Sequence, residues 1–314
     1  MLISVIIPLY NNQNLVSRCV ESVLSQISDF DFEIIIINDG STDNSLKIVI
    51  DRYQNIRNVS IIDKKNEGVS KTKNLGISLA KGKYIMFLDS DDFIFSGTLK
   101  NILQFLNTNS VDLFIFKYGR VSEHSFEANY DSLTIFRYTL DDYLKNHFPT
   151  GLAITQIYNR KVLESVRFKN FKYYEDIIFF TDSLEFVNEI VYYDCTVYAY
   201  YNNSQSVMNN LHETFFNNLI EVIHIIQEKA RSTKNLYLRD YYELAEEYLV
   251  YILIIKALKN KRYLKFICNT LAKVNFKKFI KLKKSKFHSK KFKLIISVFN
   301  IILSLLNNNS TKII

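Results

Sequence analysis

The sequence predicts an α/β protein with a doubly wound sheet, followed by a helical and strongly basic C-terminal region. In the first part of the chain, short apolar runs alternate with segments whose apolar residues recur at helical spacing. The charge then changes abruptly along the chain. Tyr248 to Ile314 contains 16 Lys and Arg and no acidic residue, whereas the residues before it carry a net charge of −8. Such an asymmetry indicates a region with a partner of its own.

The first strand is expected at Leu2 to Ile7, a mostly apolar run. Pro8 is expected to end this strand, because proline cannot donate to the ladder of a central strand. Apolar residues then recur at helical spacing from Leu15 to Leu24, and Asn11 and Asn12 are candidate caps for that helix.

The same alternation continues along the chain and supplies the rest of the predicted sheet. In order, it predicts a strand at Glu33 to Ile37, a helix from about Asp43 to Tyr53, a strand at Val59 to Ile62, a helix from about Ser70 to Ala80 and a strand at Tyr84 to Leu88. Strands that are joined through helices pair in parallel, which gives a doubly wound sheet.

Polar residues collect where each predicted strand ends. They lie at Pro8 to Asn11, Asn38 to Asp43, Lys64 to Gly68 and Asp89 to Asp92. Ligands of doubly wound sheets bind beyond the carboxyl ends of the strands, so we expect the binding site there. Turn chemistry is the alternative for any one loop, because Asp, Asn, Gly and Ser favour turns. The Gly-x-Gly-x-x-Gly fingerprint is absent after the first strand, which argues against an NAD or FAD enzyme.

Three carboxylates follow the last of these strands, at Asp89, Asp91 and Asp92. Clustered carboxylates repel one another unless a cation is present, and oxygen ligands suit a hard divalent ion that is shared with substrate phosphates. A solvated acidic turn is the alternative. An EF-hand is excluded, because Ile94 and Lys100 stand where its loop needs Gly and Glu.

These segments together resemble the family 2 glycosyltransferases, an inverting group with the GT-A fold, a Rossmann-like mixed sheet with helices on both faces. The resemblance covers residues 1 to about 115. The residues that carry it are Val5 to Asn11, Asn38 to Asp43, Asn66 to Gly76 and Gly82 to Asp92. It implies a catalytic domain at 1–210, in which 1–115 bind the nucleotide-sugar and 116–210 bind the acceptor and supply the base, followed by a helical basic region at 211–314.

The resemblance implies a UDP-sugar donor. Asp39 would accept a hydrogen bond from the imide N–H of uracil, and backbone near Pro8 and Tyr10 would line the base and ribose. Asp91, together with Asp89, would bind Mn²⁺ or Mg²⁺ that bridges the diphosphate. The implied nucleotide-sugar residues are Pro8, Tyr10, Asn11, Asp39, Asn66, Gly68, Lys73, Asp89 and Ser90.

Two residues depart from the pattern of the family. Asn38 replaces a frequent first Asp of the Asp-Asp-Gly-Ser motif, and Lys73 stands where the family usually has Arg. Lys cannot make a bidentate fork, so we expect Lys73 to contact the nucleotide as a point charge.

The family also needs a general base that deprotonates the acceptor hydroxyl. Glu175 and Asp176, at the start of a predicted helix, fit this role, with Asp176 as the base and Glu175 as the alternate. The alternative is that the pair only caps and charges the helix. Because the chain has no Trp, stacking on an acceptor sugar would fall to Tyr158, Tyr173 or Tyr174, unless these rings are core residues.

The basic tail interleaves Lys with aromatic residues from Phe276 to Lys293 and ends in the apolar stretch Leu294 to Leu306. As a helix this stretch measures ~20 Å, short of the ~30 Å that a membrane span requires. We expect an interfacial helix on an anionic membrane surface. The alternative is a basic helical bundle that packs on the catalytic domain or forms a homodimer interface. No nucleic-acid partner is expected.

Localisation follows from cysteine usage and the N-terminus. Cys19, Cys195 and Cys268 are too dispersed for a disulfide framework or a zinc motif, and the first residues lack the pattern of a secretory signal. We expect a cytoplasmic protein that is peripheral at the inner face of the cell membrane.

The expected reaction is transfer of a hexose or N-acetylhexosamine from a UDP-sugar to an oligosaccharide or lipid-linked glycan acceptor, for bacterial capsule or O-antigen. Two alternatives stay open. The first is a catalytically silent relative that binds a nucleotide or glycan. The second is a nucleotidyltransferase, which shares a similar α/β core but needs a Gly- and Arg-rich phosphate loop after the first strand.

Overall fold

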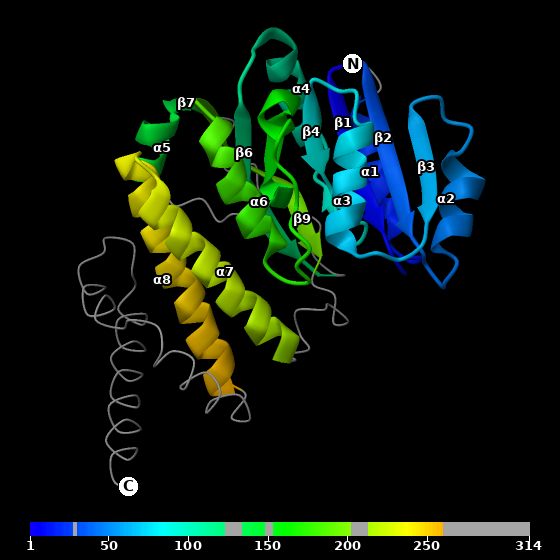
Figure 1. Cartoon of the computed structure of the whole chain (residues 1–314). Coiled ribbons are helices and arrows are strands. Elements are labelled where there is room, and N and C mark those ends of the chain that lie inside the picture. Colours follow the sequence, from blue (N-terminus) through cyan, green and yellow to red (C-terminus); the bar gives the residue numbers. More distant parts are fainter. Residues whose placement is uncertain (28–29, 123–133, 148–152, 202–212, 260–314) are drawn as a thin grey trace, which may run out of the picture. The chain divides into compact units, whose positions relative to one another are not determined.

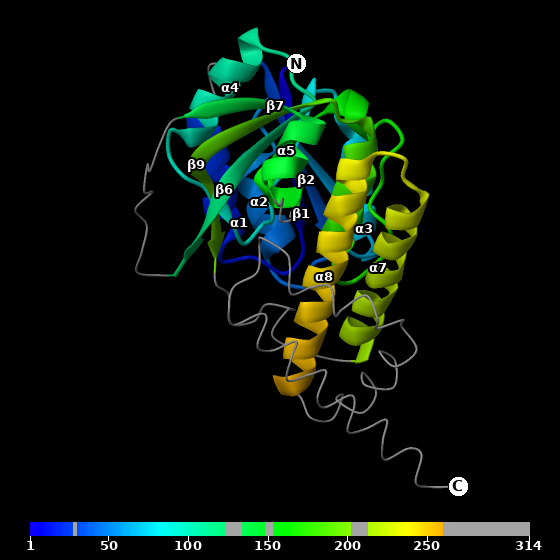
Figure 2. The ribbon, with the colours of Figure 1, turned by 90° about the vertical axis from the view of Figure 1, so that its left-hand side faces the viewer.

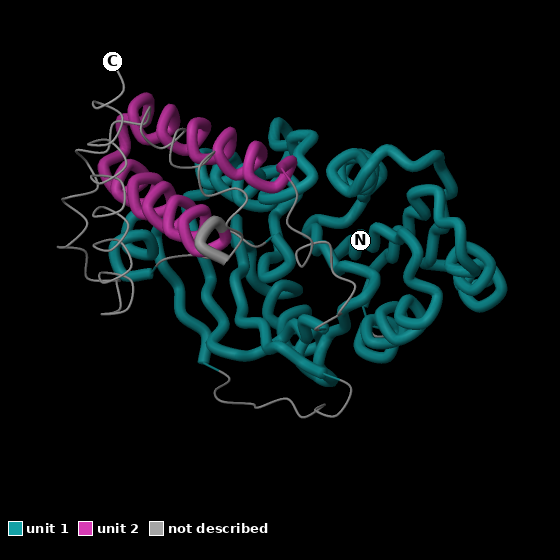
Figure 3. The backbone as a smooth tube through the Cα atoms, turned by 90° about the horizontal axis from the view of Figure 1, so that it is seen from below, with its two compact units in different colours: residues 1–210 teal, residues 211–314 magenta. Residues whose placement is uncertain are grey.

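The computed structural model describes residues 1–27, 30–122, 134–147, 153–201 and 213–259 (Figure 1). The chain divides into two compact units, Met1–Asn210 and Leu211–Ile314 (Figure 3). The first unit contains the sheet and the second contains two long helices.

The sheet of the first unit is mixed. In the described residues its strand order is β3-β2-β1-β4-β8-β6-β9-β5, with β7 added beside β9. β1 pairs in parallel with β2 and β4, and β2 with β3, whereas β8 is antiparallel to both β4 and β6. β7, β9 and β6 run side by side (Figure 2). The strands are β1 (Ile3–Leu9), β2 (Phe32–Asp39), β3 (Val59–Lys64), β4 (Tyr84–Phe87), β5 (Phe93–Ile94), β6 (Leu113–Val121), β7 (Ile135–Thr139), β8 (Gln156–Asn159) and β9 (Glu189–Tyr201).

Helices cover both faces of this sheet. The odd-numbered residues of β1 belong to the same apolar cluster as the buried residues of α1 and α4. Ile6, which points the other way, meets α3 at Gly76. Strands buried on both faces are mostly apolar, as β1 and β2 are, and the buried Ser4 of β1 donates to Glu33 of β2. The helices of this unit are α1 (Val16–Ile27), α2 (Ser45–Tyr53), α3 (Val69–Leu79), α4 (Thr98–Thr108), α5 (Leu140–Asn146) and α6 (Glu175–Ser183).

The predicted α/β fold is confirmed, but the prediction that Pro8 ends the first strand is wrong. β1 continues to Leu9 and keeps its pairing with β2. The amide of Leu88 donates to the carbonyl of Ile6, so the backbone N–H and C=O groups of the even-numbered residues of β1 point toward β4. Beyond that bond β4 has ended, and the missing N–H of Pro8 costs no ladder bond.

Asn12 lies at the start of α1, as expected, because its carbonyl accepts from the amides of Leu15 and Val16. The side chains of Asn11 and Asn12 make contacts outside this helix. The side chain of Asn11 bonds Thr42 in the loop after β2, and the side chain of Asn12 bonds Ser90 in the loop after β4. Both residues therefore connect loops of the sheet edge.

The second unit is a helical hairpin of α7 (Glu213–Ser232) and α8 (Leu236–Lys259). Asn235 sits in the connection, and its side chain accepts from the amides of Tyr237 and Leu238 at the start of α8. No helix in the described residues is both long enough and apolar enough to span a membrane. The predicted lysine-rich and apolar segments of the tail, 276–306, lie outside the described residues.

Candidate functional site

The loops after β1, β2 and β4 are bonded to one another at the carboxyl edge of the sheet. Asn11, which adopts a left-handed φ of 50°, accepts from the amide of Thr42 at 2.7 Å. Asn12 donates from its side chain to Ser90 Oγ at 2.6 Å and from its amide to Ser45 Oγ at 2.8 Å. Of the residues that are expected to bind the nucleotide-sugar, Pro8 lies in β1. Tyr10 follows β1 at the surface and is 49% exposed.

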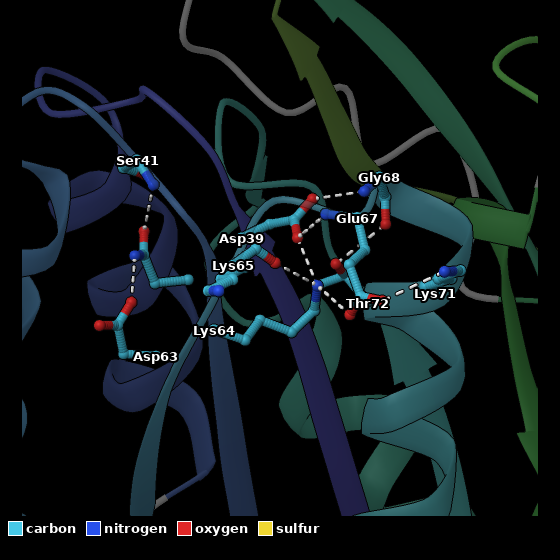
Figure 4. Close-up of polar contacts among 10 residues, drawn as sticks. Asp39, Ser41, Asp63, Lys64, Lys65, Glu67, Gly68, Lys71 and Thr72 are labelled. Carbon is cyan, nitrogen blue, oxygen red and sulfur yellow. Dashed lines mark hydrogen bonds and ion pairs between the residues drawn. The ribbon is translucent and has the colours of Figure 1, made fainter.

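The carboxylate of Asp39, at the end of β2, is buried and fully engaged on one oxygen (Figure 4). Its Oδ1 accepts from Lys64 Nζ at 2.5 Å and from the Glu67 amide at 2.9 Å, and its Oδ2 accepts from the Gly68 amide at 2.9 Å. Burial acts to raise the pKa of Asp39, but these hydrogen bonds and the charge of Lys64 outweigh it and lower that pKa. Asp39 is therefore an ionised acceptor that holds the loop after β3.

The loop that Asp39 holds contains the expected residues Asn66 and Gly68. Gly68 has a φ of 93°, and Gly40 lies so close to Asn66 that a Cβ would stand 2.7 Å from the Asn66 amide nitrogen. Lys64 also donates to the Lys65 carbonyl at 3.0 Å and to Glu67 at 3.3 Å. The loop from Lys64 to Gly68 is thus held both by Asp39 of β2 and by the bonds that Lys64 makes within the loop (Figure 4).

The structure explains why Asn, and not Asp, stands at position 38. It is almost fully buried, and its amide group donates to Asp63 Oδ1 of β3 at 2.7 Å. An Asp at position 38 would place two carboxylates in contact without a donor between them. Asn therefore suits a β3 strand that carries Asp63.

The acidic loop after β4 is anchored on β9 and α1. Asp92, 1% exposed, accepts from Tyr198 Oη at 2.5 Å and from the Tyr201 amide at 2.7 Å. Arg18 donates to the Asp91 carbonyl at 2.9 Å, and its guanidinium lies 4.5 Å from the centre of the Tyr201 ring. These contacts fix the loop without neutralising the Asp91 carboxylate.

Burial and neighbouring carboxylates raise the pKa values of Asp91 and Asp92. Burial and the neighbouring Asp89 raise the pKa of Asp91 to about 6, and burial with both other acids raises the pKa of Asp92 to about 8. Within the described residues no three His, Cys, Asp or Glu side chains form a metal cluster by themselves. Asp89 and Asp91 offer oxygen ligands only, and Mg²⁺ is commonly held by one or two carboxylates plus substrate phosphates, so the donor set fits such an ion.

Lys73, on α3, brings the acidic loop and the start of α6 together. Its side chain is 2% exposed, and its Nζ lies 3.3 Å from Asp176, 3.7 Å from Asp89 and 3.9 Å from Glu175. Burial acts to lower the pKa of Lys73, but the carboxylates of Asp176, Asp89 and Glu175 outweigh it and raise that pKa. Lys73 is therefore a buried ammonium group.

Glu175 and Asp176 begin α6, as expected, after Tyr174 in a left-handed conformation with φ 63°. Burial, and then the charge of Asp176, raise the pKa of Glu175 to about 8. Burial also raises the pKa of Asp176, against the opposing charge of Lys73. The Asp176 side chain remains 18% exposed, so a group arriving from solvent can reach it.

Two of the aromatic residues considered for sugar stacking are core residues. Tyr158 is fully buried and meets the rings of Phe87 and Phe179 edge-on, and Tyr173 is 3% exposed. For these two rings the alternative, that they are core residues, is therefore confirmed, because β8 and the segment before α6 turn them inward. Tyr174 remains partly exposed.

Sequence reasoning missed Arg18 as a part of this edge, and it did not predict the partners of Lys64 and Tyr198. Of these three residues, only Arg18 could have been suspected from its local sequence, because it is a charged residue within the apolar pattern of α1. The partners of Lys64 and Tyr198 lie 25 and 106 residues away in the chain, which spacing does not reveal.

The fold defines the class of protein. The structure resembles that of TarS residues 1–349 of S. aureus in complex with UDP-GlcNAc, with a TM-score of 0.61 and 23% identity over 83% of this chain and 73% of that chain. The fold is thus the GT-A fold, a mixed sheet with helices on both faces.

The family follows from the sequence. The glycosyl transferase family 2 model matches residues 4–167, and the chain belongs to that family. An uncharacterized glycosyltransferase of Haemophilus influenzae is 33% identical over 61% of this chain and 75% of its own length. The poly(ribitol-phosphate) β-N-acetylglucosaminyltransferase TarP of Staphylococcus aureus is 31% identical over 63% and 62%.

A further relative is much longer than this chain. The minor teichoic acid biosynthesis protein GgaB of Bacillus subtilis is 33% identical over 55% of this chain but only 20% of its own length. The first curated relatives are covered over 17% to 30% of their length.

Proposed function

We propose that this protein transfers a hexose or N-acetylhexosamine from a UDP-sugar to a glycan acceptor, with inversion at the anomeric carbon. The observation that carries the proposal is Lys73, whose ammonium group contacts Asp89 of the donor-side loop and Asp176 of α6. Lys73 thus holds a residue of the nucleotide-sugar site and the candidate base close together. This arrangement suits a reaction in which the acceptor oxygen attacks the anomeric carbon of the bound sugar donor. Membership of glycosyl transferase family 2 supports the reaction class.

Uracil recognition is assigned to Asp39. An ionised carboxylate has about four acceptor positions, and described residues of this chain use three of them, two on Oδ1 and one on Oδ2. The remaining position on Oδ2 suits one donor, such as the imide N–H of uracil. The complex of TarS 1–349 with UDP-GlcNAc supports a donor of this type.

The base of the proposed reaction is Asp176, with Glu175 as the alternate. Asp176 takes the proton of the acceptor hydroxyl, the oxygen forms a bond to the anomeric carbon, and the bond from that carbon to the UDP oxygen breaks. One displacement inverts the configuration. The raised pKa of Asp176, which burial causes, makes it a better proton acceptor than an exposed Asp.

The donor also requires neutralisation of its diphosphate. Asp91 and Asp89 are the residues that would hold Mn²⁺ or Mg²⁺, and a bound ion there would stabilise the charge that builds on departing UDP. Arg18, through the Asp91 carbonyl, and Tyr198, through the Asp89 amide and Asp92, keep the loop in position.

The acceptor is assigned to surface polysaccharide biosynthesis. The names of GgaB and TarP refer to teichoic acid biosynthesis and to a poly(ribitol-phosphate) acceptor. A lipid-linked oligosaccharide for capsule or O-antigen fits the 16 basic residues of the tail, which would bind an anionic membrane from the cytoplasmic side.

The experiment is a screen of UDP-sugars for Mn²⁺-dependent hydrolysis and for thermal stabilisation of the protein. Turnover with a defined UDP-sugar, followed by NMR of the product on a glycan acceptor, is expected to give the inverted configuration. Retained configuration would contradict the mechanism. Stabilisation by UDP without turnover on any acceptor would instead favour the silent binding relative.

A further inference from the structure

One face of α3 carries the segment that leads into α6. Ser70 Oγ donates to the Phe171 carbonyl at 3.2 Å, across 101 residues of sequence. Asn74 and Phe168 form a reciprocal pair, in which Asn74 Nδ2 donates to the Phe168 carbonyl and the Phe168 amide donates to Asn74 Oδ1, both at 2.8 Å. Positions 70, 73 and 74 lie on one side of a helix. Lys73 therefore projects from the same face that binds the 168–171 segment.

The ring of Phe168 extends this contact into the core. It stacks on Phe179 of α6 with 3.8 Å between ring centres, and it meets Phe87 of β4 edge-on at 5.2 Å. The ammonium group of Lys73 lies 5.2 Å from the centre of the Phe168 ring. The α3 face, the start of α6 and the end of β4 are thus packed around one aromatic ring.

The charge of Lys73 is balanced within the protein. Its ammonium group donates a hydrogen bond to Asp176 Oδ1 at 3.3 Å and forms ion pairs with Asp89 and Glu175 at 3.7 and 3.9 Å. A nucleotide phosphate that approached Lys73 would meet the negative charge of these three carboxylates. The Lys73 side chain is also 2% exposed, whereas those of Asp89 and Asp176 are 33% and 18% exposed, so the acids face solvent and the lysine lies behind them.

We propose that Lys73 is a positioning residue for the base, and that Ser70, Lys73 and Asn74 together hold the start of α6 beside the donor-side loop. The inference rests on the proposed function, and it gives Lys73 a different role from a nucleotide contact. A single buried cation that is shared by Asp89 and Asp176 fixes the separation of two groups that would otherwise repel each other. Removing such a cation leaves buried carboxylates without compensation.

The kinetic test compares Lys73→Met with Lys71→Met. Lys71 is on the same helix, is 53% exposed and pairs with Glu67, so it is a matched control for loss of one charge. Lys73→Met is expected to lower kcat for transfer about 100-fold, at the low end of what a general base contributes, while the Kd for the UDP-sugar in calorimetry changes less than about threefold. Lys73→Arg, which keeps the charge, should recover part of kcat. A Kd weakened tenfold or more with kcat unchanged would return Lys73 to the nucleotide site and overturn the proposal.

Asn74→Ala supplies a second variant that leaves the charges in place. It removes both hydrogen bonds to Phe168 and should lower kcat with little change in UDP-sugar Kd, because it loosens the segment before α6. An unchanged kcat in a folded Asn74→Ala protein would contradict the role of the α3 face.

A stability cycle tests the coupling without any substrate. The thermal midpoints of Lys73→Met, Asp176→Asn and the double variant are compared with that of the intact chain. Lys73→Met should lower the midpoint, and adding Asp176→Asn should restore part of the loss, because it removes a carboxylate that has lost its partner. Additive effects would overturn the proposed coupling. This cycle remains decisive if the screen finds no sugar transfer, so failure of the proposed function and failure of this inference are distinguishable.

Discussion

The ends of β2 and β4 flank the end of β1 and both carry buried aspartates, yet their electrostatics are opposite. Asp39 accepts from two backbone amides and Lys64, and its pKa is lowered. Asp91 faces other carboxylates, and burial together with Asp89 raises its pKa to about 6. The difference lies in the supply of donors. At the β2 end a lysine and two amides of the protein stabilise the ionised carboxylate, whereas at the β4 end carboxylates lie beside one another, which suits the cation that we propose for them.

The largest expected effect concerns Asp176, which shares the Lys73 ammonium group with Asp89 of the loop after β4. Asp176→Asn should lower the transfer rate about 10³-fold, because an amide cannot take the acceptor proton and a general base contributes 10²–10⁴-fold. Its UDP-sugar Kd in calorimetry should stay nearly unchanged. Asp182→Asn, on the same helix, is the control and should transfer normally. Retained transfer in Asp176→Asn would move the role to Glu175.

The next effect concerns the β4 end itself. Asp91→Asn should lower Mn²⁺-dependent turnover about 100-fold, because it replaces one of the two carboxylates that we propose as ligands for the ion with a neutral amide. Thermal unfolding should show a fold that is intact, and Asp51→Asn, an exposed position on α2, provides a control. Full activity of the variant in EDTA would contradict a metal role for Asp91.

A smaller effect sharpens the role of the β2 end. UDP should bind more tightly than CDP, because cytosine has no imide N–H and leaves Asp39 Oδ2 with an unpaired acceptor position, at a cost of about 1–3 kcal/mol. Calorimetry with UDP and CDP measures the difference, and Asp39→Asn should reduce it. Equal affinities for the two nucleotides in the intact protein would count against uracil recognition by Asp39.

The smallest effect concerns Lys64 and acid stability. The lowered folded-state pKa of Asp39 gives stability that is fully present above the unfolded pKa, near 3.8, and is lost as the pH falls through the folded pKa. Lys64→Met removes a hydrogen bond and a charge that lower this pKa, so acid unfolding should begin at a higher pH. Urea midpoints measured from pH 2 to 7 check this, with Lys65→Met, an exposed neighbour, as the control. Identical acid limbs would show that the backbone amides alone hold Asp39.

The first half of the fold was predictable because its information is local. Each strand from β1 to β4 is a short apolar run, and each helix between them has its own periodicity. Pro8 was misjudged because the consequence of its missing N–H depends on where β4 ends, which is a property of the neighbouring strand. β9 pairs with β5, β6 and β7, so its place depends on contacts that are far apart in sequence.

The places of the candidate site residues in the fold were predictable, but the contacts among them were not. Asp39, Asp89 and Asp176 could be named because they match the motifs of the family and each stands at the end or start of a predicted element. That Lys73 joins two of them could not be read from spacing, because the Lys73–Asp176 pair spans 103 residues. The sequence left open whether Tyr158 stacks on a sugar or packs in the core for a similar reason, since burial of an aromatic ring depends on the elements that pack over it.

Gly76 determines how closely α3 packs on β1. A Cβ at this position would stand 2.4 Å from Cγ2 of Ile6, closer than two non-bonded carbons can approach, so the Ile6 side chain of β1 packs directly on the backbone of α3. Lys73 lies on the same helix, less than one turn earlier. A methyl group at position 76 would lift the helix and with it the ammonium group that two carboxylates share. The position of the Lys73 ammonium group thus depends on the absence of a side chain at position 76, less than one turn further along the same helix.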